Sequence, residues 1–505
     1  MVSRLNLLAS RTAKSSEKES PTAPLRWIHL CDRCSPILVH ISVVRIMTAE
    51  VMAQEEAQTA EVVAVAEPLK EEKVAEESVE PKESAVDESK PKTVEKSSSY
   101  KEESNFLSDL KEFERKGLSE LKSKLEEAIL GNTLFEKEEP KKEALPENEA
   151  QEEKKVVVEN DVYLWGVPLL PSKGAEGVDV VLLKFLRARE FKVNDAFEML
   201  KKTLKWRKES KIDSVVDEDF GSDLASAAYM NGLDHEGHPV CYNIFGSFGT
   251  EELYQKTFGT EEKRSEFLRW RCQLMEKGIQ KLNLKPGGAS SLLQINDLKN
   301  SPGPSRKELR IATKQTVAML QDNYPEMVAK NIFINVPFWY YALNALLSPF
   351  LTQRTKSKIV VARPNKVTET LTKYIPIEEI PVHYGGFKRE NDSEFSSQDG
   401  AVSELILKAG STATIEIPAL EVGNALCWDL TVVGWEVSYK EEFVPTDEGS
   451  YTVIVQKGKK MGSQEGVVRN SFRNNEPGKV VLTVENTSNK KKRVLYRYKT
   501  NKSSF

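Results

Sequence analysis

The stretch NIFINVPFWYYALNALLSPFLTQRTKSKIVVA, residues 331–362, decides the fold. It opens with the apolar β-type run 331–335 and closes with a second run, 357–362, that contains Ile-Val-Val. Between these runs, residues 339–347 are apolar and long enough for a helix. A strand, a helix and a strand in this order predict an α/β domain with a parallel or mixed sheet.

Charge gathers at the start of the second strand. Thr352, Arg354, Thr355, Lys356 and Lys358 stand directly before its apolar residues. Charged side chains are rarely buried unless they have partners. We therefore expect some of these residues to contact a ligand or another part of the protein.

The same alternation extends on both sides of this stretch. Two helices joined at residues 191–193 come first, with Asn194 as the N-cap of the second. Further strands are predicted at 239–245 and 290–297, and further helices at 261–284, 305–321 and 366–374. We predict a helical subdomain at residues 161–212 and an α/β domain at residues 213–390.

After residue 390 the pattern becomes all-β. Turn residues such as Pro445, Gly449 and Gly458 separate short apolar runs. Such runs are typical of a β-sandwich, which we place at residues 391–505. Strands are predicted at 402–408, 413–418, 425–436, 451–456, 479–485 and 493–498.

Two differently composed segments precede the folded part. Residues 1–46 carry seven Lys or Arg, three acids and seven serines, a composition compatible with an organelle transit peptide. The alternative, which we favour, is that Met47 is the usual start and that residues 1–46 are an extension. Residues 47–160 are acidic and poor in aromatic residues, so most of this region should be disordered.

One amphipathic helix is predicted inside the acidic region. Residues 106–129 place leucine and isoleucine near helical spacing, with an interruption near Gly117. This helix could dock on the folded part or lie on a membrane, and we favour docking.

The formal net charge of −5 is unevenly distributed. Residues 61–100 hold 11 acids and six bases, whereas residues 486–505 hold seven bases and no acid. A basic C-terminal end suggests an anionic partner, either nucleic acid or a membrane.

Five cysteines, an odd number, indicate no disulfide framework and a reducing compartment. No segment approaches the ~20 apolar residues of a membrane span.

The sequence lacks the common catalytic motifs. It has no G-x-x-x-x-G-K-[ST], G-x-G-x-x-G, G-x-S-x-G or H-E-x-x-H pattern. Cys31 and Cys34 have a zinc-like spacing without a second ligand pair, and His235 and His238 lie in a Gly/Pro turn. We expect a protein that is not an enzyme and holds no metal.

Several stretches resemble known families. LLKFLRAREFKVNDAFEMLKKTLKWRK, residues 182–208, resembles the N-terminal helices of the CRAL-TRIO lipid-binding family. Residues 322–358, with IPVHYGGF at 380–387, resemble its lipid-binding core. GWEVSYKEEFVP, residues 434–445, resembles part of a GOLD domain. A CRAL-TRIO domain followed by a GOLD sandwich, behind an acidic tail, resembles the arrangement of plant patellins, and it implies a bowl that encloses one lipid.

The resemblance also implies a headgroup site. Arg189 matches the basic headgroup residue of the family and Glu326 its acid, while Thr355 and Lys358 would donate to a phosphate. Each of the four could instead have a plain structural role, for example as a charge on an edge strand. The bound ligand would be a lipid, a phosphoinositide in particular, and no other cofactor is expected.

The apolar helix of the opening stretch matches the gate that closes this bowl over the acyl chains. A density of aromatic residues also suits a membrane interface, and an ordinary core helix is equally compatible with the sequence. The gate residues are Trp339, Tyr340, Leu343, Leu346, Leu347 and Phe350.

These matches predict a cytoplasmic carrier or sensor of phosphoinositides that attaches peripherally to the plasma membrane, endomembranes or the cell plate. The resemblance implies vesicle trafficking and cell-plate formation at cytokinesis. The alternative is an adaptor with a structural lipid, whose GOLD domain and acidic tail bind trafficking proteins; nucleic acid is not expected as a partner. Contact with acidic membranes is assigned to the basic run Lys490, Lys491, Lys492 and Arg493.

Overall fold

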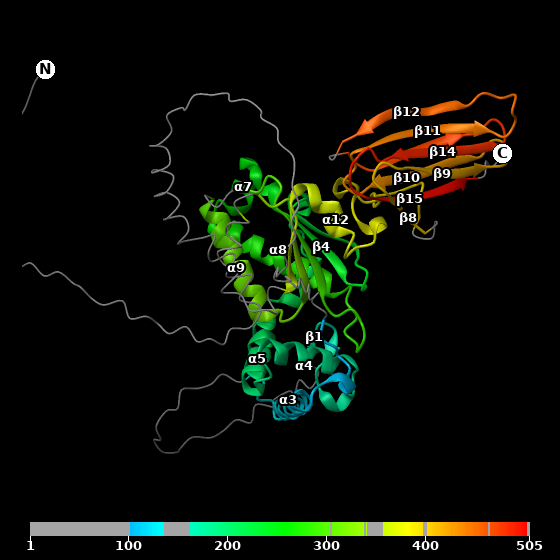
Figure 1. The fold of residues 1–505 in the computed structure, drawn as a ribbon. Coiled ribbons are helices and arrows are strands. Elements are labelled where there is room, and N and C mark those ends of the chain that lie inside the picture. Colours follow the sequence, from blue (N-terminus) through cyan, green and yellow to red (C-terminus); the bar gives the residue numbers. More distant parts are fainter. Residues whose placement is uncertain are drawn as a thin grey trace, which may run out of the picture. The chain divides into compact units, whose positions relative to one another are not determined.

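The computed structural model describes residues 102–135, 162–302, 306–337, 340, 357–396, 401–462 and 465–501. Within them the chain forms a helical unit, a five-stranded sheet flanked by helices, and a sandwich of two four-stranded sheets (Figure 1). The predicted fold class is therefore confirmed. The predictions for residues 1–46 and for disorder before residue 102 lie outside the described residues.

Three helices dominate the helical unit. Helix α3 (Glu112–Leu130) packs against α4 (Gly177–Ala188) and α5 (Val193–Glu209) in one apolar core. The smaller elements are η1 (Leu107–Asp109), β1 (Tyr163–Leu164), β2 (Val167–Pro168) and η2 (Pro171–Lys173).

Helix α3 is the amphipathic helix that the sequence predicts, and it docks. Leu121 and Leu125 are fully buried in the core shared with α4 and α5, so the helical unit includes residues that precede position 161. The predicted interruption near Gly117 is wrong, because α3 runs through this residue. A glycine costs a helix about 1 kcal/mol relative to alanine, and packing of the apolar face offsets that cost.

A sheet with the strand order β3-β4-β5-β6-β7 lies at the centre of the α/β domain. β3 pairs antiparallel with β4, and the remaining pairs are parallel. The apolar pattern predicts β4 to β7 with ends shifted by up to three residues, but it does not predict β3, whose sequence AYMNGL lacks a run of branched residues. The strands are β3 (Ala228–Leu233), β4 (Pro239–Ile244), β5 (Leu292–Asp297), β6 (Val328–Ile334) and β7 (Ile359–Val361).

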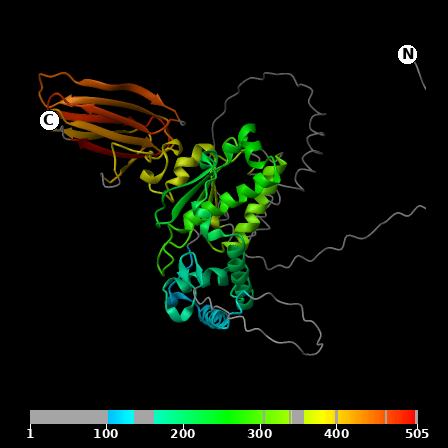
Figure 2. The same cartoon turned by 180° about the vertical axis from the view of Figure 1, so that it is seen from behind.

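Helices cover both faces of this sheet (Figure 1, Figure 2). Successive residues of β4 point to opposite faces: Cys241 shares an apolar cluster with Trp270 and Leu274 of α8, whereas Tyr242 shares one with Leu371 of α12. The helices are α6 (Ser222–Ala225), α7 (Glu251–Phe258), α8 (Glu261–Ile279), α9 (Lys307–Asn323) and α12 (Val367–Leu371). The short 3-10 turns are η3 (Ile212–Asp217), η4 (Phe245–Gly249), η6 (Pro364–Lys366), η7 (Ile377–Glu379) and η8 (Val382–Tyr384).

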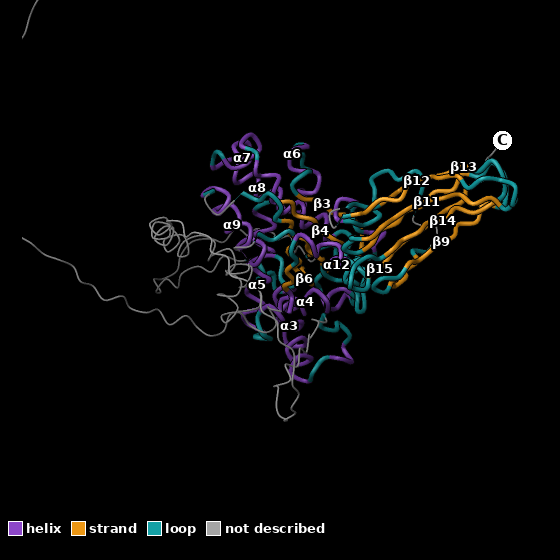
Figure 3. Tube along the Cα trace, turned by 45° about the horizontal axis from the view of Figure 1, so that its top comes forward, coloured by secondary structure: helices purple, strands orange, loops and turns teal. Residues whose placement is uncertain are grey.

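Two antiparallel sheets form the sandwich, in the orders β12-β11-β14-β9 and β13-β10-β15-β8 (Figure 3). Their inward-facing residues build one apolar core that includes Trp428, Tyr439 and Phe443. The strands are β8 (Ser403–Leu407), β9 (Thr412–Ala419), β10 (Ala425–Val432), β11 (Val437–Pro445), β12 (Val453–Met461), β13 (Val468–Arg473), β14 (Gly478–Glu485) and β15 (Lys492–Asn501).

The sandwich departs from the predicted strand pattern in two places. The single run predicted at 425–436 contains a chain reversal, because Gly434, Trp435 and Glu436 adopt left-handed φ angles of 78°, 37° and 60°. The chain leaves β10 before this reversal and returns as β11. The apolar pattern does not predict β13, because its sequence VRNSFR is mostly polar.

A buried ion cluster fixes the segment before β8 to the sandwich. Asp429 of β10 is fully buried, and its carboxylate accepts from Arg469 at 2.7 Å and from Arg497 at 2.8 Å. Asp392, in the segment before β8, pairs with Arg469 at 2.6 Å. Burial raises the pKa of Asp392, but the hydrogen bonds it accepts, chiefly from Arg469, lower it to about 2.

Leu125→Ala should lower the free energy of unfolding by roughly 2–5 kcal/mol, because it leaves a cavity in the core between α3, α4 and α5. Leu130, on the same helix, is 56% exposed. Leu130→Ala is therefore a matched control that should change the free energy by less than about 0.5 kcal/mol. Urea unfolding of the full chain measures both, and equal effects would contradict the docking of α3.

Candidate functional site

The sheet brings an acid and a base together at the amino ends of two parallel strands. Glu326 stands two residues before β6, and Lys358 directly precedes β7. The Lys358 ammonium lies 2.8 Å from a carboxylate oxygen of Glu326 and 3.5 Å from the carbonyl oxygen of Val328. The side chains of Glu326 and Lys358 are 8% and 13% exposed, so the pair is shielded from most of the solvent. Two residues of the predicted headgroup site are thus in direct contact.

Glu326 has an unusual backbone conformation. Its φ angle is 52°, in the left-handed region that residues other than glycine seldom adopt. Neighbouring contacts hold this turn: the Tyr324 hydroxyl donates to Glu276 at 2.7 Å, and the Leu292 amide donates to the Met327 carbonyl at 2.8 Å. Such conformations persist where the surroundings hold them in place, and they are concentrated at functional sites.

A second cation, Lys184 of α4, contacts the main chain of the same turn. Its ammonium donates to the carbonyl oxygen of Glu326 at 2.8 Å, and the residue is 2% exposed. Burial lowers the pKa of Lys184 to about 8, although the nearby carboxylates of Glu102 and Glu326 act in the opposite direction. The family resemblance does not point to Lys184. The available signal is a lone lysine inside the apolar run VVLLKFL, residues 180–186.

The other two predicted headgroup residues are Arg189 and Thr355, and the structure describes the first of them. Arg189 lies at the C-cap of α4, and its guanidinium donates to the carbonyl oxygen of Ala188 at 3.3 Å. Thr355 lies outside the described residues. The roles of Arg189 and Thr355 stay predictions.

Residues 102–106 form a strap, here called the N-terminal strap, that is held by α4 and by the residues before β5. Arg187 of α4 donates to the Asn105 side chain and to the Ser104 carbonyl, both at 2.6 Å. The Asn105 amide donates in turn to the Ser290 hydroxyl at 3.2 Å. These contacts connect the start of the described chain to the α/β domain.

Glu102 anchors the strap through an ion pair. Its carboxylate lies 3.0 Å from a ring nitrogen of His238 and accepts from the Ser291 hydroxyl at 2.6 Å, and the other ring nitrogen of His238 lies 2.9 Å from Asp234. Burial raises the pKa of Glu102 and lowers that of His238. The hydrogen bonds outweigh burial and bring the pKa of Glu102 to about 2 and the pKa of His238 to about 9. At neutral pH the pair is therefore a carboxylate and an imidazolium.

Of the predicted gate residues, the structure describes Tyr340. It is 2% exposed, and its ring centroid lies 5.7 Å from that of Phe333 on β6. The other predicted gate residues, Trp339, Leu343, Leu346, Leu347 and Phe350, lie outside the described residues. Each helix in the described part of the chain is too short or too polar to cross a bilayer.

The predicted basic patch contains two exposed lysines and two bases that are paired with carboxylates. Lys490 and Lys491 are exposed in the turn between β14 and β15. Lys492 and Arg493 begin β15, where Lys492 is 8% exposed and pairs with Glu436 at 3.3 Å. Arg493 pairs with a glutamate of β8, Glu404, at 2.8 Å. Half of the predicted patch is thus neutralised by carboxylates of the sandwich itself.

Comparison with known proteins identifies the domains. Residues 117–202 match the CRAL/TRIO N-terminal domain, residues 225–386 match the CRAL/TRIO domain, and residues 408–492 match the Patellin-1-like C-terminal GOLD domain. Patellin-4 from Arabidopsis thaliana is 54% identical over an alignment that covers 91% of this chain and 100% of that protein. The chain belongs to the patellin family.

Two further relatives of this patellin differ in how much of the chain they share. Patellin-3 from Arabidopsis thaliana is 50% identical over 79% of this chain and 77% of that protein. The phosphatidylinositol transfer protein SFH5 from Scheffersomyces stipitis is 30% identical over 43% of this chain and 69% of that protein. The similarity to SFH5 therefore covers less than half of the present chain.

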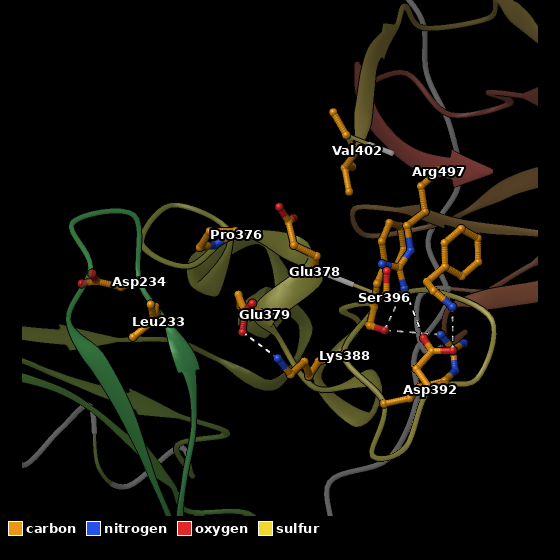
Figure 4. Close-up of a pocket in the computed structure, with 14 residues that line it drawn as sticks. Leu233, Asp234, Pro376, Glu378, Glu379, Lys388, Asp392, Ser396, Val402 and Arg497 are labelled. Atoms are coloured by element: carbon orange, nitrogen blue, oxygen red, sulfur yellow. Dashed lines mark hydrogen bonds and ion pairs between the residues drawn. The ribbon is translucent and has the colours of Figure 1, made fainter. Parts of the chain in front are cut away.

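A hollow of about 650 Å³ in this patellin lies beside the segment that precedes β8 (Figure 4). Four acids and three bases are among the residues that line it. Lys388 pairs with Glu379 at 2.9 Å, and Arg497 lies 3.5 Å from Asp392 (Figure 4). Because its bases are matched by acids, this hollow does not favour an anionic headgroup, and the Glu326–Lys358 pair remains the candidate site.

The stability of this patellin should depend on pH through Glu102 and His238. The raised pKa of His238 stabilises the fold fully below 6.5, and this contribution is lost as the pH rises through about 9. The lowered pKa of Glu102 stabilises the fold above 4.5, and this contribution is lost as the pH falls through about 2. Glu102→Gln should therefore reduce the free energy of unfolding most between pH 4.5 and 6.5.

Urea unfolding at a series of pH values measures this difference, which should shrink as His238 loses its proton above about pH 9. Glu112→Gln, at an exposed position of α3, removes the same charge and serves as the control. A loss of stability that is the same at every pH would contradict the ion pair.

Proposed function

We propose that this protein binds a phosphoinositide in its CRAL/TRIO domain and acts at membranes as a lipid carrier or sensor. The observation that carries the proposal is the shielded Glu326–Lys358 pair at the amino ends of β6 and β7. The base can donate to a phosphate, and the acid can accept from inositol hydroxyls. The name of the Scheffersomyces stipitis relative, a phosphatidylinositol transfer protein, supports the same class of ligand.

The headgroup, and not the acyl chains, would select the lipid. Enclosing two acyl chains removes about 30 methylenes from water at ~0.8 kcal/mol each, which is on the order of 20 kcal/mol. A bilayer offers these chains nearly the same environment, so exchange between bilayer and protein is close to balanced. Each charge-assisted hydrogen bond to the headgroup contributes roughly 1.5–3 kcal/mol, which is enough to discriminate between lipids.

This role places the protein in the cytoplasm, with reversible attachment to the plasma membrane, endomembranes or the cell plate. Membership of the patellin family supports a role in vesicle trafficking, and we extend the proposal to cell-plate formation at cytokinesis. The gate helix would open where the protein meets a bilayer and close over the acyl chains after uptake.

Attachment is proposed to involve one end of the sandwich. Lys490 and Lys491 follow β14, whose Glu485 lies opposite Ser438 of β11. On the other side of β11, Lys460 of β12 lies opposite the same Ser438. Neighbouring strands are about 4.8 Å apart, so Glu485 and Lys460 are separated by roughly two strand spacings. Lys490 and Lys491, in the turn that follows Glu485, therefore lie at the same end of the sandwich as Lys460. Such a cluster suits an anionic leaflet.

A second candidate function, an adaptor with a structural lipid, is favoured by the opposite end of the sandwich. Leu420 and Tyr451 lie in loops there and are 75% and 91% exposed. These loops also carry the acids Glu421, Asp447 and Glu448. Exposed apolar side chains bordered by polar ones often mark a protein interaction site. Transfer of phosphatidylinositol between vesicles separates the two functions, because an adaptor would hold its lipid without exchanging it.

Lys358→Ala should weaken phosphatidylinositol binding about 10- to 150-fold, the loss of one contact of roughly 1.5–3 kcal/mol. It should also lower stability, because Lys358 pairs with the buried Glu326. The double variant Lys358→Met with Glu326→Gln removes both charges, so stability should recover while binding does not. Lys366→Ala, at a base that is 56% exposed, is the control. Wild-type uptake of phosphatidylinositol from vesicles by Lys358→Ala would rule out this headgroup site.

Replacing Lys490 and Lys491 with Gln should weaken attachment to vesicles containing acidic lipid. Each base near an anionic leaflet is worth ~1 kcal/mol, so the loss should be about 10- to 30-fold. Sedimentation of the full chain with vesicles measures it, and binding should fall between low and physiological salt. Gln at Lys205 and Lys263, both about half exposed, removes the same charge as a control. Vesicle binding that does not depend on salt or on lipid charge would contradict electrostatic attachment. The sandwich would then be expected to bind proteins instead.

A further inference from the structure

We infer that Lys184 is a positioning residue for headgroup recognition: its ammonium fixes the main chain of Glu326 and thereby directs the Glu326 carboxylate toward Lys358. This inference rests on the proposed function, because it concerns the same headgroup site. It gives a residue of the helical unit a part in selecting the lipid.

Glu326 is held at both ends by lysine side chains. The Lys184 ammonium lies 2.8 Å from its main-chain oxygen, and the Lys358 ammonium lies 2.8 Å from its carboxylate oxygen. The two lysines come from different parts of the fold, α4 and the residue before β7. One bond fixes the position of the Glu326 main chain and the other fixes its carboxylate. Both are needed to fix the orientation of the side chain.

The conformation of Glu326 needs such support. Its φ angle of 52° is unfavourable for a residue with a Cβ, and it persists where contacts hold it. The bonds from Tyr324 to Glu276 and from Leu292 to Met327 hold the neighbours of Glu326. The bond from Lys184 acts on the carbonyl of Glu326 itself, so it bears directly on the direction of the following peptide and of the side chain.

In the described part of the chain, four charged groups have the largest electrostatic effects on Lys184. The carboxylates of Glu102 and Glu326 favour its ammonium, whereas Arg187 on the same helix and Lys358 disfavour it. Burial is the largest influence, and it lowers the pKa of Lys184 to about 8. The residue therefore loses its charge just above neutral pH, and its bond to the Glu326 carbonyl weakens from that of a charged donor to that of a neutral one.

Headgroup binding should accordingly fall as the pH rises through about 8. An arginine at position 184 keeps its charge throughout this range. His238, with a pKa of about 9, also loses charge there and contacts Glu102. Lys184→Arg leaves His238 unchanged, so the comparison isolates the contribution of residue 184.

The test uses the full chain and vesicles of phosphatidylcholine that contain phosphatidylinositol. Transfer of phosphatidylinositol to acceptor vesicles is measured between about pH 7 and 9 for the wild type, Lys184→Met, Lys184→Arg and Lys358→Ala. Lys205→Met, at a position that is 52% exposed on α5, is the matched control. Lys184→Met should transfer phosphatidylinositol about tenfold more slowly than the wild type at pH 7. Lys184→Arg should match the wild type at pH 7, and its transfer should not fall as the pH rises.

Wild-type transfer by Lys184→Met, or an unchanged pH decline in Lys184→Arg, overturns the inference. If neither variant folds, Glu102→Gln decides, with Asp234→Asn as its control, because Asp234 contacts His238 but is not among the groups that act on Lys184. Glu102→Gln should move the midpoint of the wild-type decline to lower pH and Asp234→Asn should not. An unmoved midpoint in Glu102→Gln, or an equal shift in both variants, overturns the inference. Normal transfer by Lys358→Ala would overturn the proposed headgroup site itself. Loss of transfer in Lys358→Ala with normal transfer in Lys184→Met would overturn the positioning role alone.

Discussion

Two cations buried on helix α4 constrain how distant parts of the chain fit together. Lys184 and Arg187 are 2% and 8% exposed, and a buried charge is costly unless it has acceptors. The carbonyl groups of α4 are engaged in the helix, so the acceptors come from other segments. Lys184 reaches the carbonyl of Glu326, 142 residues away, and Arg187 reaches the N-terminal strap. Because Lys184 and Arg187 need these acceptors, α4 holds both the turn before β6 and the segment before α3 in place.

The apolar pattern of the sequence predicts the elements that bury the core, because their periodicity is a direct consequence of burial. β4, β5, α8 and α9 are predicted for this reason. The pattern fails where polar residues or turns decide the structure. The reversal at Gly434–Glu436 lies inside one apolar run, and β13 carries too few apolar residues to be recognised. The strap is held by polar contacts to residues about 80 to 190 positions away, which no local pattern contains.

The candidate site divides in the same way. Glu326 and Lys358 are named by resemblance. They meet because β6 and β7 are parallel neighbours and two long side chains bridge the stagger between their starts, where Ile359 lies opposite Asn331. Lys184 is not named, because its role depends on a main-chain atom of a distant turn. A run of four bases likewise predicts a patch, but the carboxylates that neutralise Lys492 and Arg493 come from the turn before β11 and from β8. Sequence thus identifies which groups are charged, and the fold decides which charges remain available to a partner.

In the proposed headgroup site, the Glu326–Lys358 pair would limit how tightly a headgroup is held. A phosphate that binds Lys358 competes with a carboxylate already 2.8 Å from the ammonium, so the net gain is the difference between two ion pairs. When the phosphate leaves, the carboxylate takes its place, and the ammonium is not left buried without an acceptor, which would be costly. In the proposed carrier this exchange lowers the affinity and also lowers the barrier to release. A buried lysine without an internal acid would hold the phosphate more tightly and return the lipid to a bilayer more slowly. In the proposed carrier, the internal acid would therefore favour exchange of the lipid over its retention. By holding the main chain of that acid, Lys184 would help set the balance between exchange and retention.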